Sequence, residues 1–561
     1  MPEVWIREVG ESALVVEFDA KIDPATNARA VALADALRAR RMTGIRDVIS
    51  TFRSVAVFFD PFVADPAVLA SEVRTIDVRA PGGSSGRLVE VPVTYGDEAG
   101  PDLADIAAFA GCTPAEVVER HAGRLYRVYM LGFLPGYPYM AMVDERIAVP
   151  RRATPRVRVP AGSVAIAGRQ TGIYPRESPG GWHIIGRTSL TLFDPKSSPP
   201  SLFAPGDEVR FVPVAASGLA PGLPPAASGS GRTTVPLELG APDERATRVI
   251  TVLRSGLLTT IQDEGRWGWQ HQGVPVAGPM DPRAHRLANA LVGNSREAAT
   301  VEATLVGPEL RFEQEAWIAM TGGNLQPTLD GGDAPMNAPV RCRAGSVLRF
   351  GARRSGARTF IAVDGGIRVP PVLGSRATHV PSGLGGIEGR ALRAGDRLPL
   401  ARRGADPSRG RGVRGVARLP SVVGPPPTGV RLRILPGPQA DGFDPAAFDL
   451  LQQSRYTISP QSDRMGYRLS GGARLPAPAG EMISDVVFPG ALQIPPSGEP
   501  ILLMADRQTT GGYPQLAIVI AADLPLAAQL APGDRVEFEA CSRSEAMTAL
   551  GAQEGQLGAL G

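Results

Sequence analysis

The chain has 561 residues, which is too long for one hydrophobic core and suggests roughly three to five domains. The 59 Lys and Arg residues nearly balance the 56 Asp and Glu residues, so the formal net charge is only +3 and a nucleic-acid-binding protein is not expected. There is no run of about 18 apolar residues and no signal-peptide pattern, so we expect neither a membrane span nor secretion.

Lysine and cysteine are both scarce, and each scarcity excludes a class of site. Lys21 and Lys196 are the only lysines, and neither lies in a GxxxxGK[ST] motif or in a context suited to biotin attachment. We therefore expect neither a P-loop nor covalent biotin on this chain. The 3 cysteines show no CxxC spacing, which argues against disulfides and a metal site and favours a cytoplasmic protein.

Residues 1–80 are predicted to form a small, ferredoxin-like α/β unit, because alternating apolar strands there flank two amphipathic helices. Asp23 before Pro24 is a typical helix start. The short PGGSSG stretch at 81–86 then separates this unit from the next. The expected elements are strands over 4–9 and 13–18, a helix over 24–41, strands over 45–51 and 54–59, and a helix over 65–76.

The rest of the chain is predicted to be mainly β, since its 66 glycines and 54 prolines favour short strands and tight turns. Residues 402–428 are expected to be an exposed loop, and the only clear helix of the second half is expected over 281–292. The predicted units are a β domain over 87–214 with a strand at 88–95 and helices near 102–110 and 114–122, a flexible linker over 215–247, a second β domain over 248–541, and a weakly helical or frayed tail over 542–561.

One sequence pattern occurs in both halves. GRQTGIYP at 168–175 and DRQTTGGYP at 506–514 each follow an apolar run, and each precedes an Ala-Pro-Gly-Asp turn into a strand, at 204–212 and 531–539. A shared order of strand, RQT loop, Tyr-Pro and closing strand predicts two copies of one β module. We expect two closed β-barrels whose matching loops face a common cleft.

The densest group of polar residues in the first half lies in the loop 168–187. Successive glycine amides and guanidinium groups suit an anionic ligand, although a long hairpin held by its own turns is the alternative. The aromatic loop 131–140 could form an apolar pocket wall or a packed corner. The candidates are Arg169, Gln170, Thr171, Tyr174 and His183 for catalysis, and Phe133, Tyr137, Ser178, Gly180, Gly181, Trp182 and Arg187 for substrate or nucleotide binding.

The second half has a comparable polar segment over 256–281, beside its own RQT motif. Asp281 also precedes a proline at a helix start, so helix capping is the plainer explanation for it. The candidates are Arg507, Gln508 and Thr509 for catalysis, and Gln262, Asp263, Arg266, Gly278, Asp281, Asn289, Glu302, Gly511 and Tyr513 for binding.

Several of these segments resemble the two carboxyltransferase-type modules of urea carboxylase, which also occur as the paired B and C accessory proteins of bacterial 5-oxoprolinase and as sporulation kinase-inhibitor proteins. GFLPGYPYM, TPRVRVPAGSVAIAGRQTGIYP and SPGGWHIIGRT resemble subdomains C and D. GLLTTIQDEGRWGWQHQGVPVAGPMD, VDGGIRVPPVLGSRAT and ADRQTTGGYPQLAIV resemble subdomains A and B. The resemblance implies cyclophilin-like barrels in both halves around a shared active site.

The resemblance leaves three activities open. The first, which we favour, is the activation of a lactam such as 5-oxoproline by ATP, with Mg²⁺, in a complex with a separate partner that resembles the A component of 5-oxoprolinase and completes hydrolysis. The second is carboxyl transfer to urea or a similar amide from a biotin carrier on another chain. The third is a non-enzymatic inhibitor of a histidine kinase. Fold alone does not choose between them, and a homo-oligomer is compatible with each.

Overall fold

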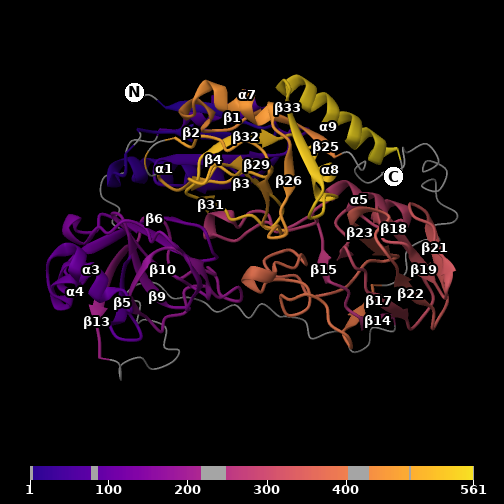
Figure 1. Ribbon diagram of the computed structural model, residues 1–561, viewed down its shortest axis with the longest axis horizontal. Coiled ribbons are helices and arrows are strands. Elements are labelled where there is room, and N and C mark those ends of the chain that lie inside the picture. The colour runs from indigo at the N-terminus through magenta and orange to yellow at the C-terminus, as the bar shows by residue number, and fades with distance from the viewer. Residues whose placement is uncertain are drawn as a thin grey trace.

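The computed structural model of the protein describes residues 4–19, 21–77, 86–215, 248–401, 429–478, 480 and 482–559. The expected loop at 402–428, and almost all of the expected 215–247 linker and the 81–86 joint, lie outside these residues. The described chain forms an N-terminal α/β unit, two closed barrels and a two-sheet body between them in sequence (Figure 1). The expected mainly β fold, with a barrel in each half and an α/β sheet at the N-terminus, is thus confirmed.

The N-terminal unit is a four-stranded antiparallel sheet with two helices, as its sequence predicts. The Asp23 carboxylate accepts a hydrogen bond from the Thr26 N–H and so caps the first helix. The strand order is β1-β2-β4-β3. The elements are β1 (Trp5–Val9), β2 (Ala13–Glu17), α1 (Pro24–Arg40), β3 (Ile45–Ser50), β4 (Ser54–Phe59) and α2 (Pro66–Thr75).

The first barrel closes through seven strands in the order β10-β7-β6-β13-β5-β12-β9, and β5 and β13 are parallel. A separate pair, β8 with β11, extends from it. Its elements are β5 (Leu88–Tyr95), α3 (Leu103–Ala110), α4 (Pro114–Ala122), β6 (Leu125–Leu131), β7 (Pro138–Ala141), η1 (Glu145–Ile147), β8 (Arg156–Val159), β9 (Ser163–Ala167), β10 (Gln170–Ile173), β11 (Ser178–Gly180), β12 (His183–Arg187) and β13 (Glu208–Pro213).

Residues 248–401 form two sheets that share one apolar core, with α5 against the outer face of the five-stranded sheet. The sheet orders are β20-β19-β22-β17-β14-β24 and β15-β16-β23-β18-β21. The elements are β14 (Val249–Arg254), β15 (Leu258–Gln262), η3 (Gln270–Gln272), α5 (Pro282–Leu291), β16 (Thr300–Thr304), β17 (Glu309–Phe312), β18 (Ala316–Asn324), β19 (Pro327–Leu329), β20 (Gly332–Asp333), β21 (Pro339–Cys342), β22 (Val347–Phe350), β23 (Ser355–Val363), η4 (Val380–Ser382) and β24 (Arg397–Pro399).

The second barrel has the order β25-β32-β29-β30-β27-β26-β33, again with its first and last strands parallel. The pair β28 with β31 corresponds to β8 with β11. Its elements are β25 (Val430–Pro436), η6 (Ala440–Gly442), α7 (Pro445–Gln453), β26 (Tyr456–Ile458), β27 (Gly466–Ser470), β28 (Asp485–Val486), β29 (Ala491–Gln493), β30 (Ile501–Leu503), β31 (Thr510–Gly511), β32 (Gln515–Val519), α8 (Leu524–Ala528), β33 (Arg535–Ala540) and α9 (Arg543–Gly558).

The two barrels have one and the same topology. If β5, β6, β7, β9, β10, β12 and β13 are matched in order to β25, β26, β27, β29, β30, β32 and β33, every strand pair of one barrel has its counterpart in the other. The prediction of a duplicated β module is therefore confirmed.

Two helices of the second half go beyond the prediction. Of the two alternatives for the tail, the helical one is observed: Ser542 and Glu545 form a capping box at the start of α9, and Arg286 of α5 donates to Glu554 of α9. The second half also contains α7, whose start at Asp444-Pro445 is a capping signal absent from the predicted elements. No helix among the described residues is both long and apolar enough to cross a membrane.

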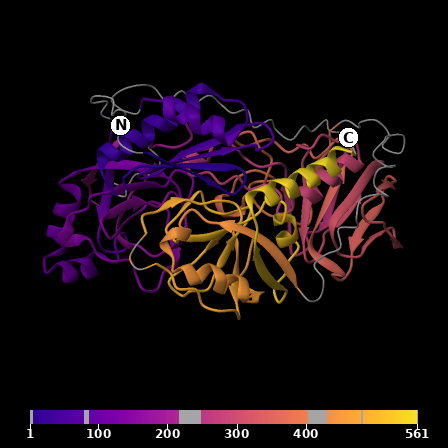
Figure 2. The same cartoon turned by 90° about the horizontal axis from the view of Figure 1, so that it is seen from above.

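The two halves are interleaved in space. The N-terminal sheet packs on the second barrel, so that Val15 and Phe58 share a core with Phe488 and Ile518 (Figures 1 and 2). Ser54 of β4 donates to the Asp485 carboxylate at 2.7 Å, and Asp47 of β3 accepts the N–H groups of Gly268 and Gln270. The first and second halves therefore form one assembly.

Candidate functional site

The two RQT motifs lie at different places in the duplicated barrel. The first spans the turn from β9 into β10, whereas the second follows β30, the counterpart of β10. In strand order, residues 504–509 correspond instead to residues 174–177, which connect β10 to β11. The expected equivalence of the two motifs is therefore wrong by one strand, because a short shared sequence carries no information about register.

The first motif is part of the first barrel's own structure. The Thr171 hydroxyl donates to the Ala165 carbonyl at 3.0 Å and lies 2.9 Å from His121 Nε2, while His121 Nδ1 lies 2.8 Å from the Tyr95 hydroxyl. These hydrogen bonds give each polar group of the three side chains a partner, with His121 protonated on Nε2. Burial lowers the pKa of His121 to about 3, so the ring stays neutral. Thr171 thus fixes helix α4 to the barrel.

Arg169 and Gln170 of this motif make no side-chain hydrogen bond or ion pair with the second motif among the described residues. Arg169 is exposed and pairs with Glu145 at 3.1 Å. Gln170 is half-buried, and its side-chain oxygen has no partner among the described residues.

The aromatic residues of the first half form a packed cluster on the outside of the barrel. The ring of Tyr137 makes edge-to-face contacts with Phe133, Tyr174 and Trp182 at centroid distances of 5.2 to 5.9 Å. Burial raises the pKa of Tyr137 well above 10. The packed corner is therefore the better description of the 131–140 loop. Ile483 of the second half packs against this cluster.

The remaining first-half candidates have local partners. The hydroxyl of Ser178 donates to the Pro179 carbonyl and Arg187 Nε donates to the Ala161 carbonyl. His183 lies with Nε2 3.1 Å from the Pro150 carbonyl, and its buried Nδ1 is without a partner among the described residues. Two glycines fit beside neighbouring rings, Gly180 against Tyr174 and Gly181 against Pro155.

The second motif rests on a buried ion network. Arg464 donates to both oxygens of Asp506 at 3.0 Å, to Glu302 and to the Gly278 carbonyl. The other Glu302 oxygen accepts the Met280 N–H. These carboxylates raise the pKa of Arg464 in spite of its complete burial. The network joins the 248–401 body to the second barrel and holds the start of the 506–511 segment in place.

Arg507 and Thr509 are buried in this segment and are not paired. Arg507 is 5% exposed, and its Nε and Nη2 have no hydrogen-bond partner in the described part of the chain. The Thr509 hydroxyl is likewise orphaned and buried. Burial alone lowers the pKa of Arg507 to about 10, so the side chain is still a cation at neutral pH. An unpaired buried cation is costly, and such a group is a candidate ligand contact.

Other orphaned polar atoms occur on the 262–266 and 377–382 segments. Arg266 donates to the carbonyls of Val372 and Ala377, but its Nη1 is unpartnered within the described chain. His379 lies beside Asp506, and its Nε2 is unpartnered in the same sense; burial lowers its pKa. Gln262 donates to Thr378 and leaves its own oxygen unpaired. These segments therefore contain several donors and acceptors that have no hydrogen-bond partner within the described chain.

A turn of the first half closes on the second motif. The Phe133 N–H donates to the Thr510 hydroxyl at 3.0 Å, and a Cβ on Gly132 would collide with that same oxygen. The Gly136 N–H donates to the Gln272 carbonyl on the other side. The turn between β6 and β7 is thus wedged between η3 and β31, and only glycine fits at 132.

The remaining candidates of the second half have mainly structural partners. Asp281 caps α5 and accepts from Gln529, so the plainer explanation holds for it. Asn289 donates to the Ala298 carbonyl, and Asp263 accepts from Ser375 and from the Arg376 N–H. Gln508 and Tyr513 are partly exposed, and Gly511 packs against Gln493 and Val487.

Three residues of this region are absent from the sequence-based candidates, His379, Arg464 and Thr510, and Arg176 is included only as one of the guanidinium groups of the loop 168–187. Arg464 is 162 residues from Glu302 and 42 from Asp506, so no local spacing indicates the network. Arg176 extends from the β10–β11 connection to 3.3 Å from the position of a Cβ on Gly383. Its sequence signals were its place in the guanidinium-rich loop 168–187 and its position after Tyr174-Pro175, in the connection that corresponds to the one carrying Arg507.

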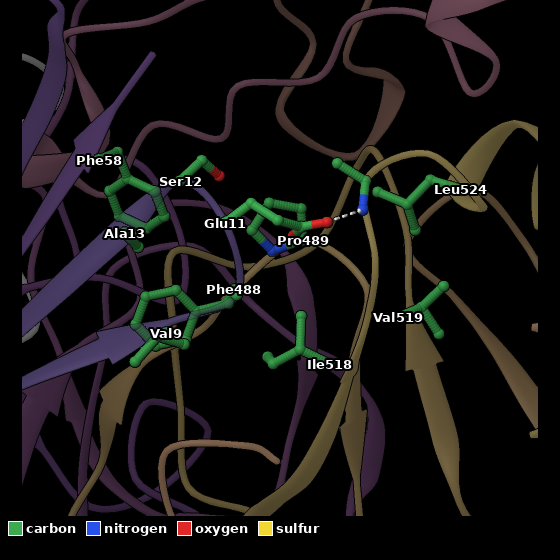
Figure 3. Close-up of a pocket in the computed structure, with 12 residues that line it drawn as sticks. Val9, Glu11, Ser12, Ala13, Phe58, Phe488, Pro489, Ile518, Val519 and Leu524 are labelled. Atoms are coloured by element: carbon green, nitrogen blue, oxygen red, sulfur yellow. Dashed lines mark hydrogen bonds between the residues drawn. The ribbon is translucent and has the colours of Figure 1, made fainter. Parts of the chain in front are cut away.

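The described residues contain no group of three or more His, Cys, Asp or Glu side chains arranged for a metal. A hollow of about 30 Å³ lies elsewhere, between the N-terminal sheet and the second barrel (Figure 3). There the Glu11 carboxylate accepts the Ala521 N–H at 2.9 Å. This hollow has room for only a few water molecules, so it is too small to be a substrate site.

Comparison with known families matches the chain in two parts. Residues 4–203 match the family described as carboxyltransferase domain, subdomain C and D, and residues 272–540 match carboxyltransferase domain, subdomain A and B. The first part includes the N-terminal α/β unit, which agrees with its packing into the common assembly.

The chain is similar to separate proteins over each half and to one solved structure over nearly its whole length. It is 39% identical to the C component of 5-oxoprolinase from Escherichia coli K12, over 54% of this chain and 94% of that protein. It is 39% identical to the B component of 5-oxoprolinase from Bacillus subtilis, over 37% of this chain and 91% of that protein. The crystal structure of TTHA0988 is 34% identical, covers 95% of this chain and 100% of its own, and superposes with a TM-score of 0.80.

A more distant similarity is to urea amidolyase of Saccharomyces cerevisiae, which is 34% identical over 52% of this chain and 16% of that protein. In each comparison the similarity covers one or both of the modules described above. The chain belongs to the carboxyltransferase-domain family and joins a C and D module to an A and B module, with its two halves homologous to the B and C components of 5-oxoprolinase.

Proposed function

We propose that this protein is a fusion of the B and C components of an ATP-dependent lactam hydrolase that acts on 5-oxoproline or a related cyclic amide. The observation that carries the proposal is the joining of a B-like and a C-like half in one chain, each about 39% identical to its relative. The contact of the β6–β7 turn with the second motif supports it, because that contact makes the site dependent on both halves.

The site residues fit an anionic substrate or cofactor. Buried guanidinium N–H groups without partners on the described chain, on Arg507 and Arg266, match the oxygens of a carboxylate or a phosphoryl group. ATP, when bound, supplies a phosphoryl group to the amide oxygen, which makes that oxygen a leaving group. Arg507 and Arg266 would hold negative charge in a site that excludes water. Mg²⁺ would bind together with the nucleotide and neutralise part of its phosphate charge.

The proposed partner is a separate cytoplasmic protein that resembles the A component of 5-oxoprolinase and completes the hydrolysis. The test is release of ADP from ATP that depends on 5-oxoproline, measured with the purified chain, with a candidate partner and with both together. We expect turnover only from the pair. Absence of lactam-dependent ADP release from the pair would reject the proposed function.

Carboxyl transfer is the second candidate, and the similarity to urea amidolyase favours it. Biotin would then have to arrive on another protein, because neither Lys21 nor Lys196 is in a biotinylation context. Urea-dependent consumption of carboxybiotin by the chain alone would favour this candidate over the first.

A further inference from the structure

Arg507 differs from every other buried arginine of the described chain. Arg464, Arg358 and Arg266 each donate at least two hydrogen bonds to carboxylates, hydroxyls or carbonyls. The Arg507 guanidinium has no such partner for its Nε and Nη2, although it is just as deeply buried. Folding has therefore removed most of this cation from water without supplying a counter-charge.

The neighbouring carboxylate does not serve as that counter-charge. Both oxygens of Asp506 are bound to Arg464, which also binds Glu302. No carboxylate contributes to the pKa of Arg507, which burial alone lowers to about 10. Two residues further on, the buried hydroxyl of Thr509 is also unpaired within the described chain. The segment thus contains an unpaired charged donor and an unpaired hydroxyl that are separated by one residue.

The turn between β6 and β7 of the first half covers the segment that carries these groups. The Thr510 hydroxyl accepts from the Phe133 N–H, and Val487 N–H donates to the Thr509 carbonyl. Arg464 holds the other end through Asp506. The backbone that carries Arg507 is therefore held at both ends of the segment.

We infer that Arg507 is the receptor for an anionic oxygen group, a carboxylate or a phosphoryl, of a small-molecule ligand, with the Thr509 hydroxyl as a second contact. A guanidinium fork binds two oxygens at once, which is the geometry that either group offers. The choice of ligands for the test rests on the proposed function, in which both a lactam carboxylate and a phosphoryl group occur.

The experiment is thermal unfolding of the full chain at constant ionic strength, with chloride as the reference anion. The probes are inorganic phosphate, 5-oxoproline, and 2-pyrrolidinone, which is the same lactam without a carboxylate. The variants are Arg507→Met and, as the matched control, Arg169→Met from the first motif. Neither the partner protein nor turnover is needed for this measurement.

We expect phosphate, 5-oxoproline or both to raise the Tm of the wild type and of Arg169→Met by several degrees at millimolar concentration. 2-Pyrrolidinone should have no such effect. Arg507→Met should lose the anion-dependent shift, and its own Tm without anion should equal or exceed that of the wild type, because an unpaired buried charge has been removed.

The outcomes separate this inference from the proposed function. A shift with phosphate only supports the anion site and counts against 5-oxoproline as the carboxylate ligand. No shift with either anion, or an undiminished shift in Arg507→Met, overturns the inference. If Arg507→Met does not fold, Arg507→Lys keeps the charge without the fork, and its phosphate affinity by calorimetry should fall at least tenfold; unchanged affinity would overturn the inference too.

Discussion

The β10–β11 connection of the first barrel and the β30–β31 connection of the second occupy the same place in two barrels of one topology, yet their chemistry differs. In the first, Tyr174 packs into an aromatic cluster and Arg176 is half-buried. In the second, Asp506 anchors an ion network and Arg507 is buried without a partner among the described residues. Duplication has thus kept the backbone frame, while polar support has developed at only one of the two positions.

This difference shows where the protein tolerates an energetic cost. Every polar group in the Tyr95–His121–Thr171 chain of the first barrel is satisfied, as expected for an element that only holds the fold. Arg507 and Thr509 of the second barrel are not satisfied by the described chain. Orphaned groups fixed by a rigid network are typical of a site prepared for a ligand.

The largest expected effect comes from breaking the support of the second connection. Arg464→Met leaves Asp506 and Glu302 buried without their cation, so we expect a loss of about 3–5 kcal/mol in the free energy of unfolding. Urea unfolding measures it. Arg468→Met, a nearby exposed arginine of β27, is the control and should change stability by less than about 0.5 kcal/mol. Equal effects of the two variants would mean that the network does not support the connection.

The stability of the first barrel should fall in acid because His121 is buried as a neutral ring. Burial lowers its pKa from 6.5 to about 3, so between these values the unfolded chain binds a proton that the folded chain does not. Stability is therefore fully present above pH 6.5 and is lost as the pH falls toward 3, by at most about 1.4 kcal/mol per pH unit from this residue.

The measurement is the slope of the free energy of unfolding against pH between 4.5 and 6, in the wild type and in His121→Gln. Because other buried histidines also titrate, the difference between the two slopes isolates His121, and we expect about 1.4 kcal/mol per pH unit. Identical slopes would show that His121 is not the neutral buried ring that its contacts with Tyr95 and Thr171 require.

Much of the fold could be predicted because its signals are local. Asp23-Pro24 marks the start of α1, the alternation over 88–95 gives β5 residue for residue, and the repeated Ala-Pro-Gly-Asp turns mark the last strand of each barrel. These features depend on a few neighbouring residues. Physical rules of capping, alternation and turn chemistry are therefore sufficient to find them.

The site could be predicted only in part, because its defining contacts are long-range. The RQT motif directed attention to Arg507 and Thr509, but the same letters in the first half are a surface residue and a core hydroxyl, Arg169 and Thr171. The two copies differ in the burial of their arginines and in the ion pair of Arg464 with Asp506 next to the second one. Neither difference can be predicted from sequence spacing. The matching of strands, and not of letters, places Arg176 in the connection that corresponds to the one carrying Arg507.

That matching can be tested with the two arginines of the first half. Arg176 extends toward Gly383 of the second half, and burial lowers its pKa, whereas Arg169 is paired with Glu145 at the surface. We expect Arg176→Met to lower kcat/KM of the reconstituted complex about tenfold, as for loss of one partly screened charge contact, and Arg169→Met to change it less than about threefold. The reverse order would restore the motif-based pairing of Arg169 with Arg507.

The smallest expected effect concerns the hydrogen bond between the Phe133 N–H and the Thr510 hydroxyl, which joins the two halves. Thr510→Val removes the acceptor for the Phe133 N–H but keeps the side-chain shape, whereas Thr510→Ser keeps the hydroxyl. One neutral hydrogen bond contributes about 0.5–1.5 kcal/mol. If it positions Arg507, Thr510→Val should lower kcat/KM threefold to tenfold and speed amide exchange in residues 506–511, with Thr510→Ser close to wild type. Exchange that rises throughout the second barrel would instead mean that Thr510 stabilises the barrel as a whole, and the contact would then be a packing feature with no special relation to the site.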